Sequence, residues 1–267
     1  MNCLTIQDLG LSEENLVKKI GDYGVYFRDS IQNIFLETEI FRYMKLDYFC
    51  SLVDDGILYI PNRNKFTDLR DRLGLEKHIA KHPFDFGFSA VPSYRERGWR
   101  KSLEKENKKV MDVCISCWTT DMLLNGVVDE SFLMWKSYAN TELACRIKTS
   151  IKYLINSITE LSCDIVVSGV EYSNDNNKTY NDLLFKKTCY YESEHEVRFV
   201  ALTSGKDHVD IKINPESLYF SLTVSPFLTP IMESLVINGL KRRYPRLKDV
   251  IEPSRVMEYP NTKPIKK

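Results

Sequence analysis

The sequence predicts an α+β fold: a single elaborated domain with a mixed or antiparallel sheet at its core and helices at its periphery. Two observations favour this class. The 267 residues are 43% hydrophobic and 28% charged, an ordinary composition for a chain long enough to bury its own core. Short β-prone and short helical segments are interspersed, and they form neither a regular βαβ alternation nor an even series of hairpins.

The first element expected is a helical extension at residues 1–38, which precedes an α+β domain of catalytic type at residues 39–267. Ser12 stands before two acidic residues, as a helix N-cap does. Leu16 and Ile20 then continue an apolar stripe at helical spacing.

The domain that follows is expected to consist of short strands and helices. Strands are predicted at residues 40–44, 57–60, 110–118, 143–147, 165–172, 196–202, 209–213 and 218–224. Helices are predicted at residues 46–54, 99–109, 149–160, 178–188 and about 227–243. The stretch 62–100 has aromatic residues among glycine and proline without a sustained period, which indicates a loop that covers a substrate.

Charge and hydropathy exclude several classes of protein. Lys plus Arg and Asp plus Glu each total 37, so the chain is not a uniformly basic nucleic-acid binder. Residues 241–267 nevertheless hold nine basic and three acidic residues, which leaves a polyanionic acceptor possible. No apolar run approaches the ~20 residues needed to span a bilayer, and no secretory segment is present, so we expect a cytoplasmic protein without a membrane partner.

The cysteines and histidines do not predict a metal site. The seven cysteines are odd in number and scattered, as is typical of reduced thiols. Cys114 and Cys117 have the spacing of half a zinc site, but no second pair exists, and on a strand they would point to opposite faces. His78 and His82 are four residues apart but have no acidic or cysteine partner nearby in the sequence.

A run of acidic residues leads into one predicted strand. The charged residues alternate along the chain: Glu192, Glu194, Glu196 and Arg198. In an extended chain they would share one face, and crowded carboxylates raise the pKa of at least one of them unless a cation is close. A polar sheet face held by an ion pair would have the same pattern.

Two further segments have the chemistry to bind a ligand. Trp135 and Tyr138 combine rigid rings with polar tips, which suits stacking on a ring-bearing ligand, although an aromatic core helix would have the same residues. Arg42 lies between Phe41 and Tyr43 in a predicted core strand, where an unpaired guanidinium is costly to bury. We therefore expect Arg42 to meet a carboxylate or a bound anion, and its geometry suits phosphate.

Taken together, these segments resemble a bacterial family of unknown function with a recurring order of motifs. The family pattern is an aromatic-Arg-Tyr strand, a Leu-x-Phe/Tyr strand leading into Phe-x-Asp, then Cys-Phe-Ser, Leu-Met-Trp-x-x-Tyr-Ala and Lys-x-x-x-Trp-x-x-Glu-x-Glu-x-Arg. The matches span roughly residues 40–225 and comprise 41–43, 58–60, 66–68, 117–119, 133–139, Lys187, Tyr191, Glu194, Glu196 and Arg198. Tyr191 replaces a family Trp and Thr119 a family Ser, which keeps the chemistry, whereas Leu69 replaces a family Pro.

More loosely, the order is similar to that of the ADP-ribosyltransferase superfamily, in which an Arg strand, a Ser/Thr strand and a Glu-x-Glu strand bind NAD. This resemblance implies NAD as a substrate, with Arg42 and the adjacent Tyr43 at its phosphates. It also implies that Thr119 or Ser116 supports the nicotinamide ribose. The hypothesis requires that Arg42, Thr119 and Glu196 line one cleft.

The same resemblance assigns the reaction to the two glutamates. Glu196 would stabilise the positive charge that develops on the ribose as the nicotinamide leaves, and Glu194 would select or activate the acceptor. Trp135 or Tyr138 would stack on the nicotinamide or the adenine. The implied protein is a toxin or anti-phage defence effector that modifies a nucleic-acid or protein acceptor and has a neutralising antitoxin as a partner.

Two other functions fit the residues. A metal-assisted nuclease or phosphoesterase would use Glu192, Glu194 and Glu196 with Asp68 or Asp71, although a neighbouring arginine weakens binding of a divalent cation. A non-catalytic ligand- or partner-binding domain would use the acidic strand structurally and the aromatic segment as its docking site.

Overall fold

The computed structural model describes residues 4–28, 34–66, 110, 112–120, 123–124, 127–128, 130–139, 143–173, 179–203, 205–218 and 220–256. The predicted helix at 99–109 and most of the predicted loop at 62–100 lie outside these residues, as do Asp68, Asp71, His78 and His82. In the part of the chain that is described, no helix is long and apolar enough to cross a membrane.

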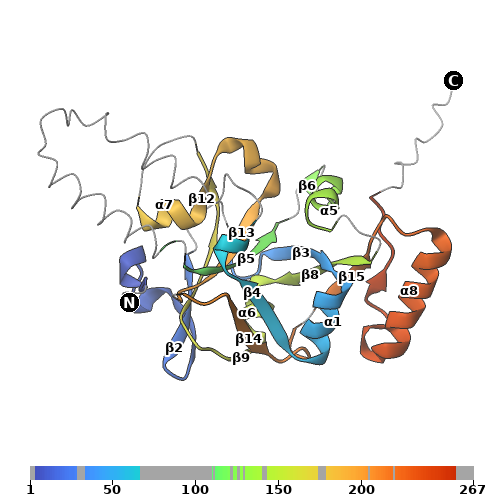
Figure 1. The fold of residues 1–267 in the computed structure, drawn as a ribbon, viewed down its shortest axis with the longest axis horizontal. Helices are drawn as coiled ribbons and strands as arrows, with labels where there is room; N and C mark the ends of the chain where they lie inside the picture. Colours follow the sequence, from blue (N-terminus) through green and yellow to red (C-terminus); the bar gives the residue numbers. More distant parts are fainter. Residues whose placement is uncertain are drawn as a thin grey trace, which may run out of the picture.

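A nine-stranded mixed sheet forms the core, and helices lie around it (Figure 1). Its strand order is β1-β2-β10-β13-β5-β3-β8-β15-β16. The bounds are β1 (Leu16–Ile20), β2 (Tyr23–Arg28), β3 (Glu39–Lys45), β5 (Cys114–Thr119), β8 (Ala144–Ser150), β10 (Ile165–Gly169), β13 (Glu196–Ala201), β15 (Ser221–Val224) and β16 (Ile251–Glu252). Pairs β2–β10 and β15–β16 are parallel and the other neighbours antiparallel, which confirms the predicted α+β class.

The nine strands fall into two groups that meet at one residue pair. β13 pairs with β5, and β3 with β8, along the whole length of both strands. Between the groups, β3 pairs with β5 only through Phe41 and Thr119. Because the ladder does not continue past this pair, side chains of both strands line a cavity at the junction.

A second, three-stranded antiparallel sheet lies against the first, with β14 (His208–Ile213) between β4 (Ile57–Pro61) and β9 (Ile158–Glu160). Burial alternates along β14 and β4, so that one face of this sheet is buried and the other is partly exposed. The buried side chains of β14 and β4 join the main hydrophobic core with residues of β3 and β5. Two short ladders pair β6 (Leu123–Leu124) with β7 (Val127–Val128) and β11 (Glu171–Tyr172) with β12 (Lys186–Lys187).

The helices are short and several have a capping side chain. They are α1 (Leu46–Asp54), α5 (Phe132–Tyr138), α6 (Ile151–Ser157), α7 (Tyr180–Phe185) and α8 (Pro230–Arg243). Ser131, Ser150 and Thr229 accept hydrogen bonds from backbone N–H groups in the first turns of α5, α6 and α8. The predicted helices at 149–160 and 178–188 extend too far, because β9 and β12 begin within them.

The N-terminal segment does not form the expected helical extension. Its described residues contribute strands β1 and β2, and Ser12 caps only a single 3-10 turn, Glu13–Asn15. Gly21 has φ 60 in the turn between the strands, a conformation that glycine adopts without steric cost. Since β2 pairs with β10 and Val25 is fully buried, tertiary pairing overrides the helical spacing of the apolar residues.

Candidate functional site

Six of the eight predicted site residues line one small cavity at the junction of β3 and β5. The cavity measures about 40 Å³ and is lined by Phe41, Arg42, Tyr43, Cys117, Trp118, Thr119, Met134, Tyr138, Glu194 and Glu196. Arg42, Thr119 and Glu196 therefore lie around the same space, as the sequence-based hypothesis requires. The volume suits a few water molecules rather than a nucleotide ring.

The other two predicted residues lie in the core. Ser116 is fully buried, and its Oγ accepts a hydrogen bond from Trp118 Nε1 at 3.0 Å. Trp135 is also fully buried; its Nε1 donates to Glu130 Oε2 at 3.0 Å, and its ring packs edge-on against Tyr43. Trp135 and Met134 are the buried residues of the otherwise exposed helix α5, and neither Trp135 nor Ser116 lines the small cavity or the larger one described below.

Two carboxylates share one lysine at the edge of the small cavity. Lys187 Nζ lies 2.8 Å from Glu194 Oε2 and 2.8 Å from Glu196 Oε2. Glu196 also accepts hydrogen bonds from Arg198, at 2.8 Å from Nε and 3.1 Å from Nη2. Because Lys187, Glu196 and Arg198 are nearly inaccessible to solvent, these are strong charge-assisted contacts that compensate one another.

The Arg198 side chain also forms a hydrogen bond with a second element, α7. Its Nη1 donates to the Leu184 carbonyl oxygen at 2.7 Å, and no part of the side chain is exposed. Cys117 is the ladder partner of Arg198 on β5. Burial, together with the negative charge of Glu196, raises the pKa of the Cys117 thiol well above its usual value, so the thiol stays protonated and is not a ready nucleophile.

The residue between the two glutamates, His195, has a left-handed backbone conformation. His195 has φ 42, which is costly for a residue other than glycine and occurs mostly where surrounding contacts enforce it. Those contacts come from β5 and the residue after it: Thr119 Oγ1 donates to the Glu194 carbonyl oxygen, and Thr120 N donates to the His195 carbonyl oxygen at 2.9 Å. The turn brings Glu194 and Glu196 to the same lysine from two different elements.

The prediction that Glu192, Glu194 and Glu196 share one face of an extended chain is therefore wrong. Glu192 and Glu194 lie in a 3-10 helix, Cys189–Glu194, and β13 begins only at Glu196. The charged residues of β13 are Glu196 and Arg198, which are two residues apart and therefore share a face of the strand. The ion pair that the alternative interpretation proposed is present, within one strand rather than between two.

Two tyrosines complete the surroundings of the carboxylates. Tyr138 OH donates to Glu194 Oε1 at 3.1 Å, and Tyr172 OH accepts a hydrogen bond from the backbone N of Glu196 at 2.8 Å. Burial raises the pKa of both tyrosines, and the Glu194 charge raises that of Tyr138 further, so both remain protonated at neutral pH. The sequence reasoning missed the role of Tyr172 and gave Lys187 only a place in a motif.

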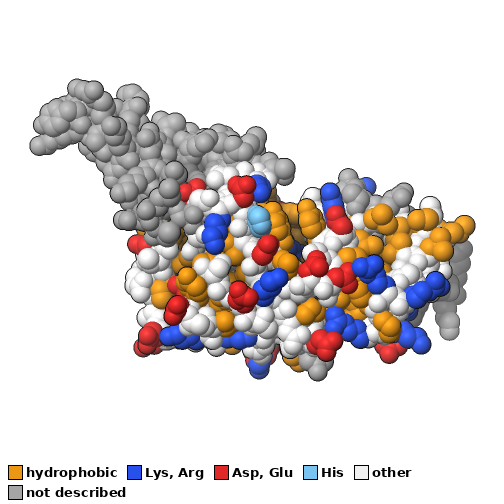
Figure 2. All heavy atoms as spheres, turned by 60° about the horizontal axis from the view of Figure 1, so that its bottom comes forward, with side chains coloured by type: hydrophobic (Ala, Val, Ile, Leu, Met, Phe, Trp, Pro, Cys, Tyr) orange, Lys and Arg blue, Asp and Glu red, His pale blue; other side chains and the backbone are white. Residues whose placement is uncertain are grey.

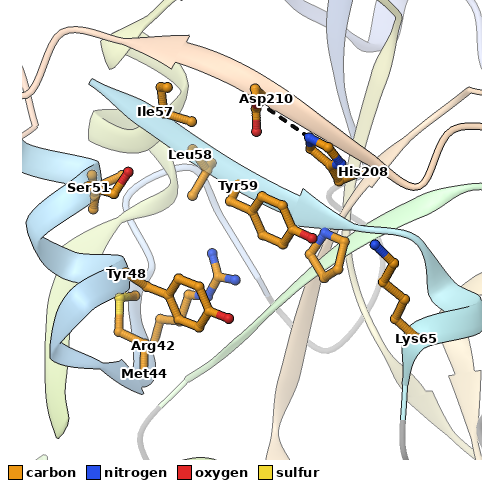
Figure 3. A pocket seen from close by; sticks show the side chains of 12 residues that line it. Arg42, Met44, Tyr48, Ser51, Ile57, Leu58, Tyr59, Lys65, His208 and Asp210 are labelled. Atoms are coloured by element: carbon orange, nitrogen blue, oxygen red, sulfur yellow. Dashed lines mark ion pairs between the residues drawn. The ribbon is translucent and has the colours of Figure 1, made fainter. Parts of the chain in front are cut away.

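A second cavity of about 520 Å³ shares Arg42 with the first, and its size is typical of small-molecule sites. Its walls come from β3, α1, β4 and β14 (Figure 3), and the face that carries these elements is hollowed (Figure 2). The lining residues are Arg42, Met44, Tyr48, Ser51, Leu52, Ile57, Leu58, Tyr59, Pro61, Lys65, His208 and Asp210. Apart from Arg42, none of these was predicted as a site residue, because they come from segments far apart in the sequence and only 58–60 belongs to a motif.

Arg42 has no fixed counter-ion in the described structure. Among the described residues, none accepts a hydrogen bond from it or forms an ion pair with it, and its guanidinium lies 5.6 Å from the centre of the Trp118 ring. Burial lowers its pKa. Of the two partners expected for this arginine, a carboxylate is absent among the described residues.

Compared with known proteins, the chain matches no protein-family model, no curated protein and no solved structure. The motif resemblances described above therefore stay predictions.

Proposed function

We propose that the protein is an ADP-ribosyltransferase-like enzyme, with the fold of that superfamily, that cleaves NAD and transfers ADP-ribose to an acceptor. The observation that carries the proposal is that Arg42, Thr119, Glu194 and Glu196, which come from three distant segments of the sequence, line one cavity. The division of the sheet at β3 and β5 supports it, because it opens this cavity. The larger cavity, which also contains Arg42, has room for a nucleotide.

In this proposal each charged residue has one role in the reaction. Arg42 binds the pyrophosphate, since it has no other counter-ion among the described residues. Glu196 is a fixed negative charge near the ribose, where positive charge develops as the nicotinamide leaves. Glu194, whose side chain is 15% exposed, is the more accessible carboxylate and activates the acceptor. Lys187 positions both carboxylates.

The acceptor is proposed to be a nucleic acid or a protein, and the biological role that of a toxin or anti-phage effector neutralised by an antitoxin. The basic last turn of α8, with Lys241, Arg242 and Arg243, favours a polyanionic acceptor. We place the reaction in the cytoplasm, because the six cysteines of the described residues are free thiols.

The test is to incubate the purified chain with NAD labelled in its adenylate phosphate, and with RNA, DNA or a protein extract. We expect release of nicotinamide and transfer of label to one acceptor class. Glu194→Gln and Glu196→Gln should lower the rate by about 10²–10³-fold, because each removes a carboxylate beside the reacting ribose. Glu192→Gln, in the same 3-10 helix but outside the cavity, is the matched control and should react like wild type.

Each variant is first checked for folding by circular dichroism and urea unfolding. Absence of both NAD turnover and label transfer with every acceptor would contradict the proposal. So would a folded Glu196→Gln variant with the wild-type rate.

A non-catalytic ligand-binding domain is the second candidate. It is favoured by the complete pairing of Glu196, whose two oxygens both contact cations, and by the pairing of Glu194 with Lys187 and Tyr138. NAD binding without turnover would support it. A metal-dependent nuclease fits less well, because Lys187 and Arg198 occupy the carboxylate oxygens that a divalent cation would need.

A further inference from the structure

The larger cavity combines an apolar interior with a few convergent polar groups. Leu52, Leu58 and Met44 supply apolar surface, while Arg42 and His208 contribute polar groups from different strands. Figure 3 shows the Arg42 side chain and the rings of Tyr48 and Tyr59 around the same space. This composition is typical of a site that takes a ring-bearing ligand with one charged end.

The charges of the cavity differ in how they are compensated. Lys65 Nζ lies 4.0 Å from Asp207 Oδ2, and His208 Nε2 lies 3.6 Å from Asp210 Oδ2. Arg42 has no such partner among the described residues. A guanidinium that is desolvated without a counter-ion favours an anion with several oxygens, and phosphate accepts its hydrogen bonds in a planar, paired arrangement.

An aromatic row runs along the wall of the same cavity. The Tyr48 and Tyr59 rings are nearly parallel, with an interplanar angle of 5° and centroids 6.3 Å apart. Tyr59 stacks in turn on His208, at 5.0 Å and 26°. The row extends from α1 across β4 to β14, and such a surface binds a flat heterocycle by stacking.

From these two features we infer that the larger cavity binds a nucleoside 5′-phosphate, with the phosphate at Arg42 and the base against the Tyr59 and His208 rings. The ligand is either a free nucleotide, including the adenylate half of a dinucleotide, or a unit of single-stranded nucleic acid. The inference concerns binding only and does not depend on the proposed transfer reaction. In this site the base is recognised by Tyr59 and His208 and not by Trp135, which is buried in the core.

The experiment measures binding by isothermal titration calorimetry with the full chain. The probes are AMP, adenosine, inorganic phosphate, NAD and a short single-stranded oligonucleotide. We expect AMP to bind at least about ten-fold more tightly than adenosine, because adenosine lacks the group that Arg42 holds. Competition between AMP and the oligonucleotide distinguishes the two sources of the ligand.

Two variants test the two halves of the site. Arg42→Met should remove the difference between AMP and adenosine, whereas Tyr59→Leu should weaken both by about ten-fold. Matched controls are Arg246→Met, which removes an exposed arginine paired with Glu216, and Tyr190→Leu, which removes a tyrosine that is 83% exposed; neither lines the cavity. Arg42→Lys keeps a positive charge and should retain part of the preference for AMP.

No AMP binding at millimolar concentration would overturn the inference. Binding that is unchanged in both Arg42→Met and Tyr59→Leu would also overturn it, because the nucleotide would then lie elsewhere. If nucleotides bind here but nicotinamide is never released, the proposed transferase function fails while this site stands. If NAD is consumed but neither Arg42→Met nor Tyr59→Leu changes nucleotide affinity, the proposed nucleotide site fails while the transferase function stands.

Discussion

The two cavities that share Arg42 differ in how their charges are compensated. At the small cavity, Glu194 and Glu196 both contact Lys187, and Glu196, which is almost fully buried, also contacts Arg198. At the larger cavity, Arg42 has neither a carboxylate nor a carbonyl partner among the described residues. Among the described residues, the charges of the small cavity are thus paired with one another, whereas Arg42 is not paired.

The positions of Glu196 and Arg42 on their strands explain why one is paired and the other is not among the described residues. Glu196 and Arg198 are two residues apart on β13, so both side chains lie on the same face and pair within the strand. Arg42 lies on β3 next to the single pair that joins β3 to β5, where no neighbouring ladder brings a carboxylate to it.

The largest effect is expected from Arg198→Met. This change removes one of the two cations that contact the buried Glu196 carboxylate, together with the hydrogen bond to the Leu184 carbonyl, and leaves only Lys187. We expect the free energy of unfolding to fall by about 3–5 kcal/mol, measured by urea denaturation. The double variant Arg198→Met/Glu196→Gln should lose less than the sum of the single changes, because the carboxylate that Arg198 compensates is removed as well. A loss below about 1 kcal/mol in the single variant would mean that the ion pair is not structural.

A smaller effect is expected at the turn between the two glutamates. His195→Val places a β-branched residue at φ 42 and should lower the free energy of unfolding by about 1–3 kcal/mol. His195→Gly, which adopts this conformation freely, is the control and should change stability by less than about 1 kcal/mol. Equal losses in both variants would show that the imidazole, not the backbone, stabilises the turn.

Arg42→Met is expected to change stability little, in contrast with Arg198→Met. Removing a partly buried cation that has no counter-ion among the described residues leaves none of them unpaired, so the free energy of unfolding should stay within about 1 kcal/mol of wild type or rise. Urea denaturation of both variants under one set of conditions gives the comparison directly. A loss as large as that of Arg198→Met would mean that Arg42 has a structural partner, and the distinction between the cavities would fail.

The smallest effect is expected at an exposed ion pair, which serves as the reference. Arg243 Nη2 donates to Asp54 Oδ2 at 2.6 Å, and this hydrogen bond lowers the pKa of Asp54. A carboxylate with a lowered pKa in the folded state stabilises the fold above its unfolded pKa of about 3.9, and this contribution is lost as the pH falls through the lowered value. Asp54→Asn should therefore cost about 0.2–1 kcal/mol at neutral pH and progressively less in acid. A cost that is independent of pH would assign the effect to packing.

Much of the fold could be predicted because local signals and tertiary structure agree. The helix α1 and the strands β3 and β13 lie where the pattern placed them, since each has a burial pattern readable from its own residues. The segment with β1 and β2 was predicted wrongly, because its apolar spacing fits a helix and only pairing with β10 makes it a strand.

The residues of the candidate site also differ in whether the sequence predicts them. Arg42, Glu194 and Glu196 could be named because unusual charges in apolar strands are visible in the sequence. Glu192 was misplaced, since a 3-10 helix ends two residues after it and breaks the alternation on which the prediction depended.

The sequence by itself determined the class of fold, most of its strands and the residues whose charge needs a partner, because these depend on residue type and short-range spacing. Only the tertiary structure decided which partner each charge receives. Lys187 reaches both glutamates through the turn at His195, whereas Tyr48, Tyr59 and His208 meet beside Arg42 because α1, β4 and β14 pack together. Such meetings depend on strand order and register, which no local pattern specifies.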